Sequence, residues 1–345
     1  MAAVFNLKRA SLGYNERCSI AAGVSTATVS RVINHPEIVD TRTRDKVQAA
    51  IKALNYRRNE VARGLASQSS RTIGVVVNTF ASTYFGRMME GVSVALREQG
   101  FHTIVESSNL NVDGERRSID SLVSRQVDAL IIYSFRLSDK EVGELMSSLP
   151  TMVLIDRQVS GYEERCVALD NEQGGATVAR YLLERGHEKI AMIEGHDFID
   201  GTALRSKGFT DILKEAGHPV APDCILKSDF SFNGGYKAMR ALIKSDQKFT
   251  AVFAHNDQMA AGAIDACREA GFSVPHDVSI VGFDDLDVAY YTSPKLTTVR
   301  FPLEMMGRSA AVLAHSLATD KAASMSTHQR VFVPEIVERE SVRKL

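Results

Sequence analysis

Residues 23–34 read Gly-Val-Ser-Thr-Ala-Thr-Val-Ser-Arg-Val-Ile-Asn, and this stretch decides the fold of the N-terminal region. Gly23 suits a left-handed turn because it has no Cβ, and Ser25 suits the N-cap of a helix. After the cap, apolar residues recur at i, i+3 and i+4. They are Val29, Val32 and Ile33. The pattern predicts a tight turn followed by a short amphipathic helix.

The opposite face of this helix carries small side chains and one cation. Its members are Thr26, Ala27, Ser30 and Arg31, with no carboxylate among them. Such a face can enter a groove lined by phosphates and meet base edges, which is what a helix-turn-helix protein requires of its recognition helix. The twelve residues alone fit an ordinary surface helix equally well.

Charge along the chain favours the first interpretation. Up to residue 70 there are eleven Lys and Arg and five Asp and Glu, a net charge of +6. The whole chain of 345 residues carries −1, so the remainder carries −7. A basic N-terminal region on a mildly acidic body is typical of a nucleic-acid-binding protein.

Composition limits the class of protein further. A hydrophobic fraction of 44% and a charged fraction of 24% predict globular domains with sizeable cores. The four cysteines lie far apart without metal-ligand spacing, so we expect reduced, buried thiols and no cofactor. No apolar run is long enough to span a membrane, and no secretory signal is recognisable, which favours a cytoplasmic protein.

Two further segments complete the N-terminal region. Residues 41–54 predict a helix capped by Thr41, with apolar residues at helical spacing. Residues 57–71 are polar and linker-like, although Asn59 could cap one or two helical turns. This segment is either a flexible tether or a hinge helix that folds on DNA and inserts Leu65 into the minor groove.

From residue 72 onward, short apolar strands alternate with amphipathic helices. Continuous apolar runs such as 72–78 are typical of parallel strands covered on both faces. The alternation restarts after residue 165, which predicts two doubly wound parallel-sheet subdomains with a cleft between them. The expected organisation is a small all-α head over 1–57, a hinge and linker over 58–71, and an α/β core over 72–345. Within the core we expect 72–160 to join 290–318, and 161–289 to join 319–345.

Ligands of open parallel sheets bind at the carboxyl ends of the strands. The candidate effector-binding residues are therefore the polar and aromatic side chains near the ends of the expected strands. They are Tyr84, Phe85, Tyr133, Asp156, Arg205, Phe230, Asn256, Asp284 and Phe301. Carboxylates, amides and ring faces with few cations suit a neutral polyhydroxylated ligand. Each residue taken alone could instead be a helix cap or a loop anchor.

Signals of catalysis are weak. The sequence has no nucleophile elbow, P-loop, zinc-protease motif or dinucleotide fingerprint. An enzyme on a doubly wound fold would need a nucleophile and base that the sequence does not show. A sugar-binding or transport protein would need an export signal and has no use for a basic head.

The ordered motifs of the chain resemble the lactose/galactose-repressor family of bacterial transcription regulators over residues 18–345. Besides 22–34, they are Leu-Asn-Tyr-Arg at 54–57, Ala-Arg-Gly-Leu-Ala at 62–66, Phe-Ala-His-Asn-Asp-Gln-Met-Ala-Ala-Gly at 253–262, Ile-Val-Gly-Phe-Asp-Asp at 280–285, Leu-Thr-Thr-Val-Arg at 296–300 and Val-Glu-Arg-Glu-Ser at 337–341. The segments 152–157 and 165–171 are most similar to the galactose repressor and isorepressor branch. The family's first helix normally shows an apolar residue and then Asp-Val-Ala, where this chain has Asn15, Arg17, Cys18 and Ser19.

The resemblance implies a cytoplasmic, nucleoid-associated homodimer without a tetramer-forming tail. Its heads would bind a near-palindromic operator, and its type I periplasmic-binding-protein-like cores would bind a galactose-like or related sugar that controls operator affinity. Thr26 and Ala27 would face bases, whereas Ser25, Thr28, Ser30, Arg31 and Asn34 would meet bases or phosphates. Leu65 would be the hinge wedge. Eight of the nine candidate effector residues, all except Phe301, fall on the family's effector positions.

Overall fold

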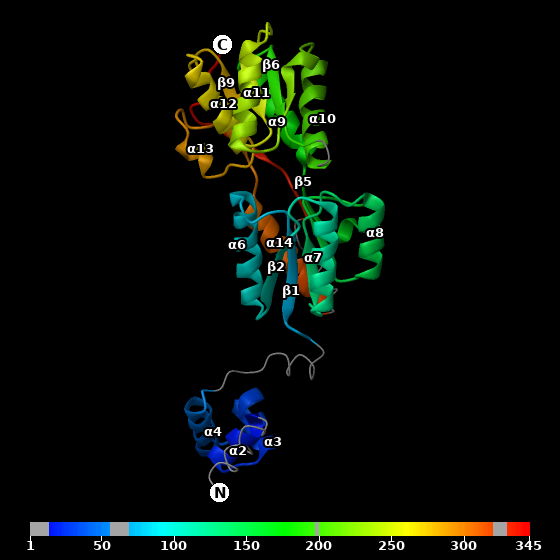
Figure 1. Cartoon of the computed structure of the whole chain (residues 1–345), viewed down its shortest axis with the longest axis vertical. Helices are drawn as coiled ribbons and strands as arrows, with labels where there is room; N and C mark the ends of the chain where they lie inside the picture. Colours follow the sequence, from blue (N-terminus) through cyan, green and yellow to red (C-terminus); the bar gives the residue numbers. More distant parts are fainter. Residues whose placement is uncertain (1–13, 56–68, 197–199, 320–329) are drawn as a thin grey trace. The chain divides into compact units, whose positions relative to one another are not determined.

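The computed structural model describes residues 14–55, 69–196, 200–319 and 330–345, which belong to two units, the head (1–67) and the core (68–345). Figure 1 labels their helices and strands. The head contains α2 (Tyr14–Ala22), α3 (Thr26–Asn34), the 3₁₀ turn η1 (Pro36–Ile38) and α4 (Thr41–Ala53). The proposed hinge residues Asn59 and Leu65 lie outside the described residues.

The turn and helix predicted from residues 23–34 are confirmed. Gly23 has φ +66°, in the left-handed region, and α3 follows with Ser25 as its N-cap. The Ser25 hydroxyl accepts a hydrogen bond from the backbone N–H of Thr28 at 3.1 Å. Val29 and Val32 are buried, so the apolar face predicted for this helix packs into the head.

The first helix of the head is anchored by Cys18. Its side chain is fully buried against Val29, Val32 and Val47, whereas Asn15 is exposed. Cysteine behaves as a small apolar side chain, so it can fill an aliphatic core position. The thiol therefore takes the buried place in a segment that otherwise departs from the family pattern.

The predicted cap of α4 was wrong. Asp40, not Thr41, is the N-cap, because its carboxylate accepts a hydrogen bond from the backbone N–H of Thr43 at 3.0 Å. The same contact holds the pKa of Asp40 below its usual value. Asp and Thr are both good capping residues, and the sequence does not decide between neighbours.

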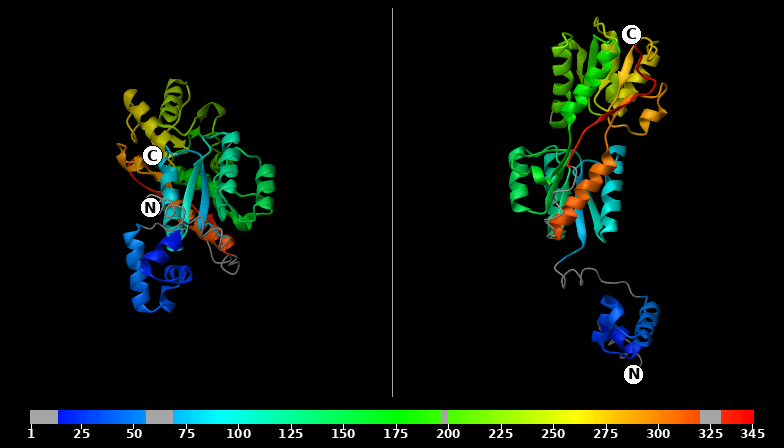
Figure 2. Two further views of the ribbon diagram at one scale, coloured as in Figure 1. Left: turned by 60° about the horizontal axis from the view of Figure 1, so that its bottom comes forward. Right: turned by 180° about the vertical axis from the view of Figure 1, so that it is seen from behind.

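The first lobe of the core is built on a six-stranded sheet of order β11-β5-β4-β3-β1-β2, and all its pairs are parallel. Helices α6 and α14 pack on one face, and α7 and α8 on the other (Figures 1 and 2). The strands are β1 (Thr72–Val77), β2 (His102–Ser107), β3 (Ala129–Ile132), β4 (Met152–Ile155), β5 (Cys166–Leu169) and β11 (Val331–Phe332). The helices are α6 (Thr83–Glu98), α7 (Val112–Ser124), α8 (Asp139–Ser148) and α14 (Leu303–Ala318).

The second lobe repeats this plan with a parallel sheet of order β7-β6-β8-β9. Its strands are β6 (Ile190–Glu194), β7 (Ile225–Lys227), β8 (Ala251–Ala254) and β9 (Ser279–Val281). Its helices are α9 (Asn171–Glu184), α10 (Asp200–Glu215), α11 (Phe232–Lys244), α12 (Asp257–Glu269) and the short α13 (Val288–Tyr291). Short 3₁₀ turns at Glu163–Arg165 (η2) and Pro222–Cys224 (η3) precede β5 and β7. The βα alternation and both parallel sheets confirm the predicted fold class.

The boundary between the two lobes differs from the prediction. β5 and β11 pair with each other, and β5 also pairs with β4, so 166–169 and 331–332 belong to the first lobe. Conversely, Leu296 packs into the core of the second lobe, and Thr297 forms a bridge to Val281. The chain crosses between lobes after β5, after β10 (Thr298–Arg300) and between β11 and β12 (Glu335–Val337). β10 and β12 form a separate antiparallel pair.

Paired helices approach closely through glycines. A Cβ on Gly175 of α9 would lie 2.0 Å from the carbonyl oxygen of Arg205, and one on Gly208 of α10 would lie 1.9 Å from the carbonyl oxygen of Glu172. Only glycine permits backbones to meet at this distance. The α9–α10 contact therefore fixes the helix that carries Arg205.

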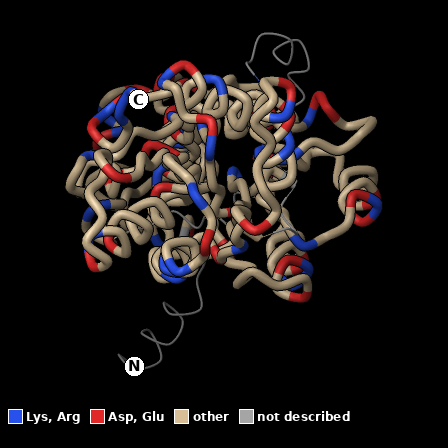
Figure 3. The backbone as a smooth tube through the Cα atoms, turned by 90° about the horizontal axis from the view of Figure 1, so that it is seen from above, with Lys and Arg blue, Asp and Glu red and all other residues tan. Residues whose placement is uncertain are grey.

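The buried residues support these layers. One apolar cluster extends through both lobes and includes Phe209, Phe253, Phe283 and Phe301. All four cysteines are free and buried, as predicted. No helix in the described parts of the chain is long and apolar enough to cross a membrane. Lys and Arg positions are interspersed with Asp and Glu positions along the backbone (Figure 3).

Candidate functional site

The outer face of α3 carries the side chains that the sequence predicts to contact DNA. Ser25, Thr26, Ala27 and Arg31 are exposed, while Thr28 and Ser30 are partly exposed. Asn34 ends the helix. The helix therefore buries its aliphatic side and presents hydroxyls, a methyl group and a guanidinium outward.

In the core, three of the predicted effector residues form one hydrogen-bonded group in the first lobe. The hydroxyls of Tyr133 and Tyr84 both donate to Asp156 Oδ2, at 2.8 and 3.1 Å. Tyr84 lies at the start of α6, after β1, and Tyr133 directly follows β3. Because β1 and β3 are the strands between which the strand order reverses, these residues lie where doubly wound sheets bind ligands.

Asp156 and Asp284 both have a positive φ angle, and both carboxyl groups are buried. Their φ values are 62° and 111°, in the region that favours glycine, and such strain is typical of functional sites. Burial raises the pKa of Asp156, and it raises the pKa of Asp284 well above its ordinary value. Asp156 follows a strand of the first lobe and Asp284 a strand of the second, so two carboxyls approach the junction from opposite sides.

Arg205 is the buried cation of this junction. Burial lowers its pKa, and Asp284 and Asp156 are the largest opposing influences, in that order. Its Nε and Nη2 donate to Asn171 Oδ1 at 3.2 and 2.8 Å, and its Nη1 donates to the carbonyl oxygen of His255. The guanidinium also stacks over Phe283, with Cζ 3.6 Å from the ring centroid. All three guanidinium nitrogens therefore have protein acceptors.

Asn256 and Phe230 meet each other in the second lobe. Asn256 is the N-cap of α12: its Oδ1 accepts from the backbone N–H of Met259 at 2.8 Å, and its Nδ2 donates to the Phe230 carbonyl at 3.0 Å. Phe230 has φ 62°. Asn256 is thus a helix cap, as the sequence allowed, that also holds the backbone of a strained aromatic residue.

Aromatic rings line the side of the junction formed by Tyr84. The Tyr84 ring meets Phe85 and Phe301 edge to face, with centroids 5.2 and 5.5 Å apart. Phe85 packs in the same way on Tyr133 at 4.8 Å, and Phe301 on Phe283 at 6.1 Å. The rings and the buried polar groups together form what we call the junction cluster. It consists of Tyr84, Phe85, Tyr133, Asp156, Asn171, Arg205, His255, Phe283, Asp284 and Phe301.

Three members of the junction cluster were absent from the predicted site. Asn171 is the first residue of α9 and resembles an ordinary helix start, and Phe283 resembles a core residue. His255 follows β8, and its position at a strand end was the signal that could have identified it. Burial lowers its pKa well below 6.5, so the ring is neutral. Gly195 donates to His255 Nδ1 at 3.4 Å, which places the proton on Nε2.

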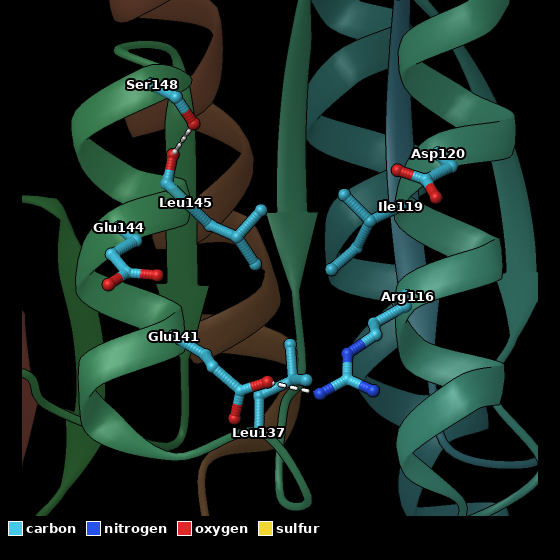
Figure 4. A pocket seen from close by; sticks show the side chains of 8 residues that line it. All are labelled: Arg116, Ile119, Asp120, Leu137, Glu141, Glu144, Leu145 and Ser148. Carbon is cyan, nitrogen blue, oxygen red and sulfur yellow. Dashed lines mark hydrogen bonds and ion pairs between the residues drawn. The ribbon is translucent and has the colours of Figure 1, made fainter.

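A groove elsewhere on the core has different chemistry. It lies between α7 and α8, has a volume of about 340 Å³ and contains none of the predicted effector residues (Figure 4). Its lining residues are Arg116, Ile119, Asp120, Leu137, Glu141, Glu144, Leu145 and Ser148. Arg116 pairs with Glu141 across it, and no aromatic ring faces it. Within the described ranges, no group of three or more His, Cys, Asp or Glu side chains is arranged to hold a metal ion.

A helix-turn-helix head followed by a two-lobed parallel α/β core defines a DNA-binding regulator with a ligand-binding core. Residues 19–59 match the model of bacterial regulatory proteins of the lacI family, and 179–342 match the periplasmic binding protein-like domain. The chain is 39% identical, over 93% of its length, to the HTH-type transcriptional regulator GalS of Salmonella typhimurium strain LT2, and covers 94% of that protein.

Solved structures agree with this assignment. The chain matches a lac repressor dimer bound to operator and the anti-inducer ONPF, with a TM-score of 0.85, 26% identity, and coverage of 94% of this chain and 98% of that one. It also matches a complex of the transcriptional regulator CelR with cellobiose, with a TM-score of 0.70, 30% identity, and coverage of 96% and 100%. The chain belongs to the lacI family of bacterial regulatory proteins. It is a DNA-binding transcriptional repressor and not an enzyme.

Proposed function

We propose that this chain acts in the cytoplasm, on the nucleoid, as a homodimeric repressor of a near-palindromic operator, and that a small neutral sugar in its junction cluster controls operator affinity. The lac repressor structure is described as a dimer on its operator, and the CelR structure holds cellobiose. Sugar binding between the lobes would change the arrangement of the two lobes. This change would raise or lower the affinity of the heads for the operator.

The observation that carries the sugar proposal is the balance of groups in the junction cluster. Two buried carboxyls, Asp156 and Asp284, face a single guanidinium, whose three nitrogens already donate to protein acceptors. Three of its five N–H groups are therefore already bonded to the protein, and its single positive charge faces two carboxyls, so the cluster offers no excess positive charge to an anionic ligand. Ligand hydroxyls can donate to the two carboxyls, and the faces of Tyr84 and Phe301 can pack on sugar C–H groups.

Isothermal titration calorimetry of the full-length protein tests the ligand class. The panel contains neutral hexoses and pentoses, beginning with D-galactose, and the corresponding sugar phosphates and sugar acids. We expect at least one neutral sugar to bind and the anionic derivatives to bind more weakly. Tight binding of a sugar phosphate or acid with no binding of any neutral sugar would contradict the proposal.

DNA binding is tested separately by fluorescence anisotropy with a palindromic operator and a scrambled duplex. Arg31 is exposed at the recognition face and carries no carboxylate partner in the recognition helix, so Arg31→Ala should weaken operator binding by about 1–3 kcal/mol. Equal binding of both duplexes by the wild type, or unchanged operator affinity in Arg31→Ala, would contradict the proposed contact of Arg31 with the operator.

A further inference from the structure

Arg87 connects the two lobes directly. It lies on α6 of the first lobe, and its Nη1 donates to the carbonyl oxygen of Asp285 at 3.1 Å. Its Nη2 pairs with the carboxylate of Asp287. Both acceptors lie on the loop between β9 and α13 of the second lobe, so one side chain makes a two-point contact between the lobes.

The loop that Arg87 contacts is hydrogen-bonded to other segments of its own lobe. The backbone N–H of Leu286 donates to Asp257 Oδ2 at 2.7 Å. The carboxylate of Asp285 accepts from Arg339 at 2.5 Å and from Arg300 at 2.9 Å. A contact with this loop therefore acts on the whole second lobe and not on a loose segment.

The same two segments carry residues of the junction cluster. Arg87 lies three positions after Tyr84, so both belong to the first turns of α6. The contacted loop begins at Asp284, one residue before Asp285. The Arg87 contact therefore sets the separation between the Tyr84–Asp156 side and the Asp284 side of the proposed sugar site.

We propose that Arg87 is a positioning residue that holds the two lobes in the arrangement that binds sugar, without touching the sugar itself. This inference rests on the proposed function. The side chains of Arg87 and Asp287 are 37% and 54% exposed, so the ion pair is partly screened by water and salt. The contact is thus weak enough to open, and it raises sugar affinity by populating the competent arrangement before the sugar binds.

Calorimetric titration of full-length Arg87→Gln with D-galactose, or with the neutral sugar that the wild type binds best, tests the proposal. We expect Kd to rise about three- to tenfold, because glutamine removes the charge and one of the two contacts. Raising NaCl from 50 to 500 mM should weaken the wild type toward the variant and leave the variant nearly unchanged. In Arg87→Gln with Asp287→Asn, the second substitution should add little, because the two residues form one interaction.

Arg308→Gln is the matched control. Arg308 of α14 pairs with Glu98 of α6 at 2.5 Å, with side chains 51% and 50% exposed, and both residues lie in the first lobe. The control loses a comparable ion pair that also involves α6, through Glu98, but lies within one lobe, so its sugar affinity should equal that of the wild type. Unchanged affinity in Arg87→Gln, or an equal loss in Arg308→Gln, would overturn the proposal.

Hydrogen exchange of the sugar-free proteins keeps this test independent of the proposed function. If Arg87 holds the lobes, backbone amides of residues 284–291 should exchange several-fold faster in Arg87→Gln than in Arg308→Gln. Identical exchange in the two variants would overturn the role of Arg87. A wild type that binds no sugar in the panel would overturn the proposed ligand class, and the exchange result would still decide the role of Arg87.

Discussion

Asn171 fixes the orientation of Arg205: its Oδ1 accepts from Nε at 3.2 Å and from Nη2 at 2.8 Å. Because Asn171 begins α9 and Arg205 lies on α10, the hydrogen bonds join two helices of the second lobe. Both residues are buried. The guanidinium charge is thereby held in one place, where it partly offsets the burial that raises the pKa of Asp156 in the first lobe.

Asn171→Ala should lower the free energy of unfolding of the core by about 1–3 kcal/mol, because it leaves two buried guanidinium donors without an acceptor. Urea unfolding of the full-length protein measures the change. Gln173→Ala, on the same helix, is the control: its side chain lies 3.4 Å from the hydroxyl of Thr177 and holds no buried charge, so we expect a change within about 0.5 kcal/mol. Equal effects of the two substitutions would contradict this role of Asn171.

The buried carboxyl of Asp257 makes the stability of the core depend on pH. It accepts from the Thr298 hydroxyl at 2.5 Å and from the backbone N–H of Leu286 at 2.7 Å, yet burial raises its pKa to about 7. The folded state therefore favours the protonated form. The stability from this group is fully present below its ordinary value near 3.8 and is lost as pH rises through 7.

Asp257→Asn should remove this contribution. Between pH 5 and pH 7 the wild type should lose unfolding free energy relative to Asp257→Asn, by at most about 1.4 kcal/mol per pH unit. Urea unfolding at several pH values measures this difference. In Gln173→Ala, which changes no titratable side chain, the difference should not vary with pH. A difference for Asp257→Asn that is constant over this range would contradict the expectation.

The contact of α9 with α10 predicts a steric effect at Gly175. An alanine Cβ there would lie 2.0 Å from the carbonyl oxygen of Arg205, so α10 must move. We expect Gly175→Ala to lower the unfolding free energy by about 1–3 kcal/mol and to weaken sugar binding, because the displaced backbone carries the guanidinium.

Gly143→Ala is the control for this substitution. Gly143 lies on α8, where a Cβ would be 3.7 Å from the Tyr162 ring, an ordinary contact. Alanine should therefore be neutral there or stabilise the helix by up to about 1 kcal/mol. Urea unfolding and calorimetry on both variants make the comparison. If Gly175→Ala is as stable as Gly143→Ala, then α9 and α10 can move apart without loss of stability, and the predicted steric effect is wrong.

Most of the core could be predicted from the sequence because its strands are continuous apolar runs that end in polar residues. Tyr133 and Asp156 were found in this way, since parallel strands bring their carboxyl ends to one edge. β5 and β11 were missed because no helix separates β5 from β4 and because β11 has two residues only. A two-residue strand has no periodicity, so its pairing with β5 depends on packing between segments more than 150 residues apart.

The candidate site was less predictable than the fold. Asn171 acts through Arg205, and Arg87 acts between lobes, so neither role follows from a position at a strand end. Asp40 and Thr41 show the same limit locally, because two adjacent residues can both cap a helix and the backbone geometry decides which does. Strand ends therefore identify part of the candidate site, and the remaining residues are identified only by contacts between segments that are distant in the sequence.

The N-cap of α3 predicts how firmly the recognition helix is formed. The Ser25 hydroxyl accepts from the backbone N–H of Thr28 at 3.1 Å and lies 2.8 Å from the Thr28 hydroxyl. Ser25→Ala leaves that N–H without its capping acceptor and should destabilise the helix by about 1 kcal/mol. Amide exchange of residues 28–33 in the full-length protein should then be about fivefold faster.

Ser25→Asn separates capping from other effects of the substitution. Asparagine is as good an N-cap as serine and, like alanine, lacks the hydroxyl. Exchange at 28–33 should therefore stay near the wild-type rate in Ser25→Asn and rise only in Ser25→Ala. If both variants exchange equally fast, the hydroxyl contact with Thr28, and not the cap itself, stabilises the helix. If neither differs from the wild type, packing of Val29 and Val32 alone forms the helix, and the cap contributes nothing measurable.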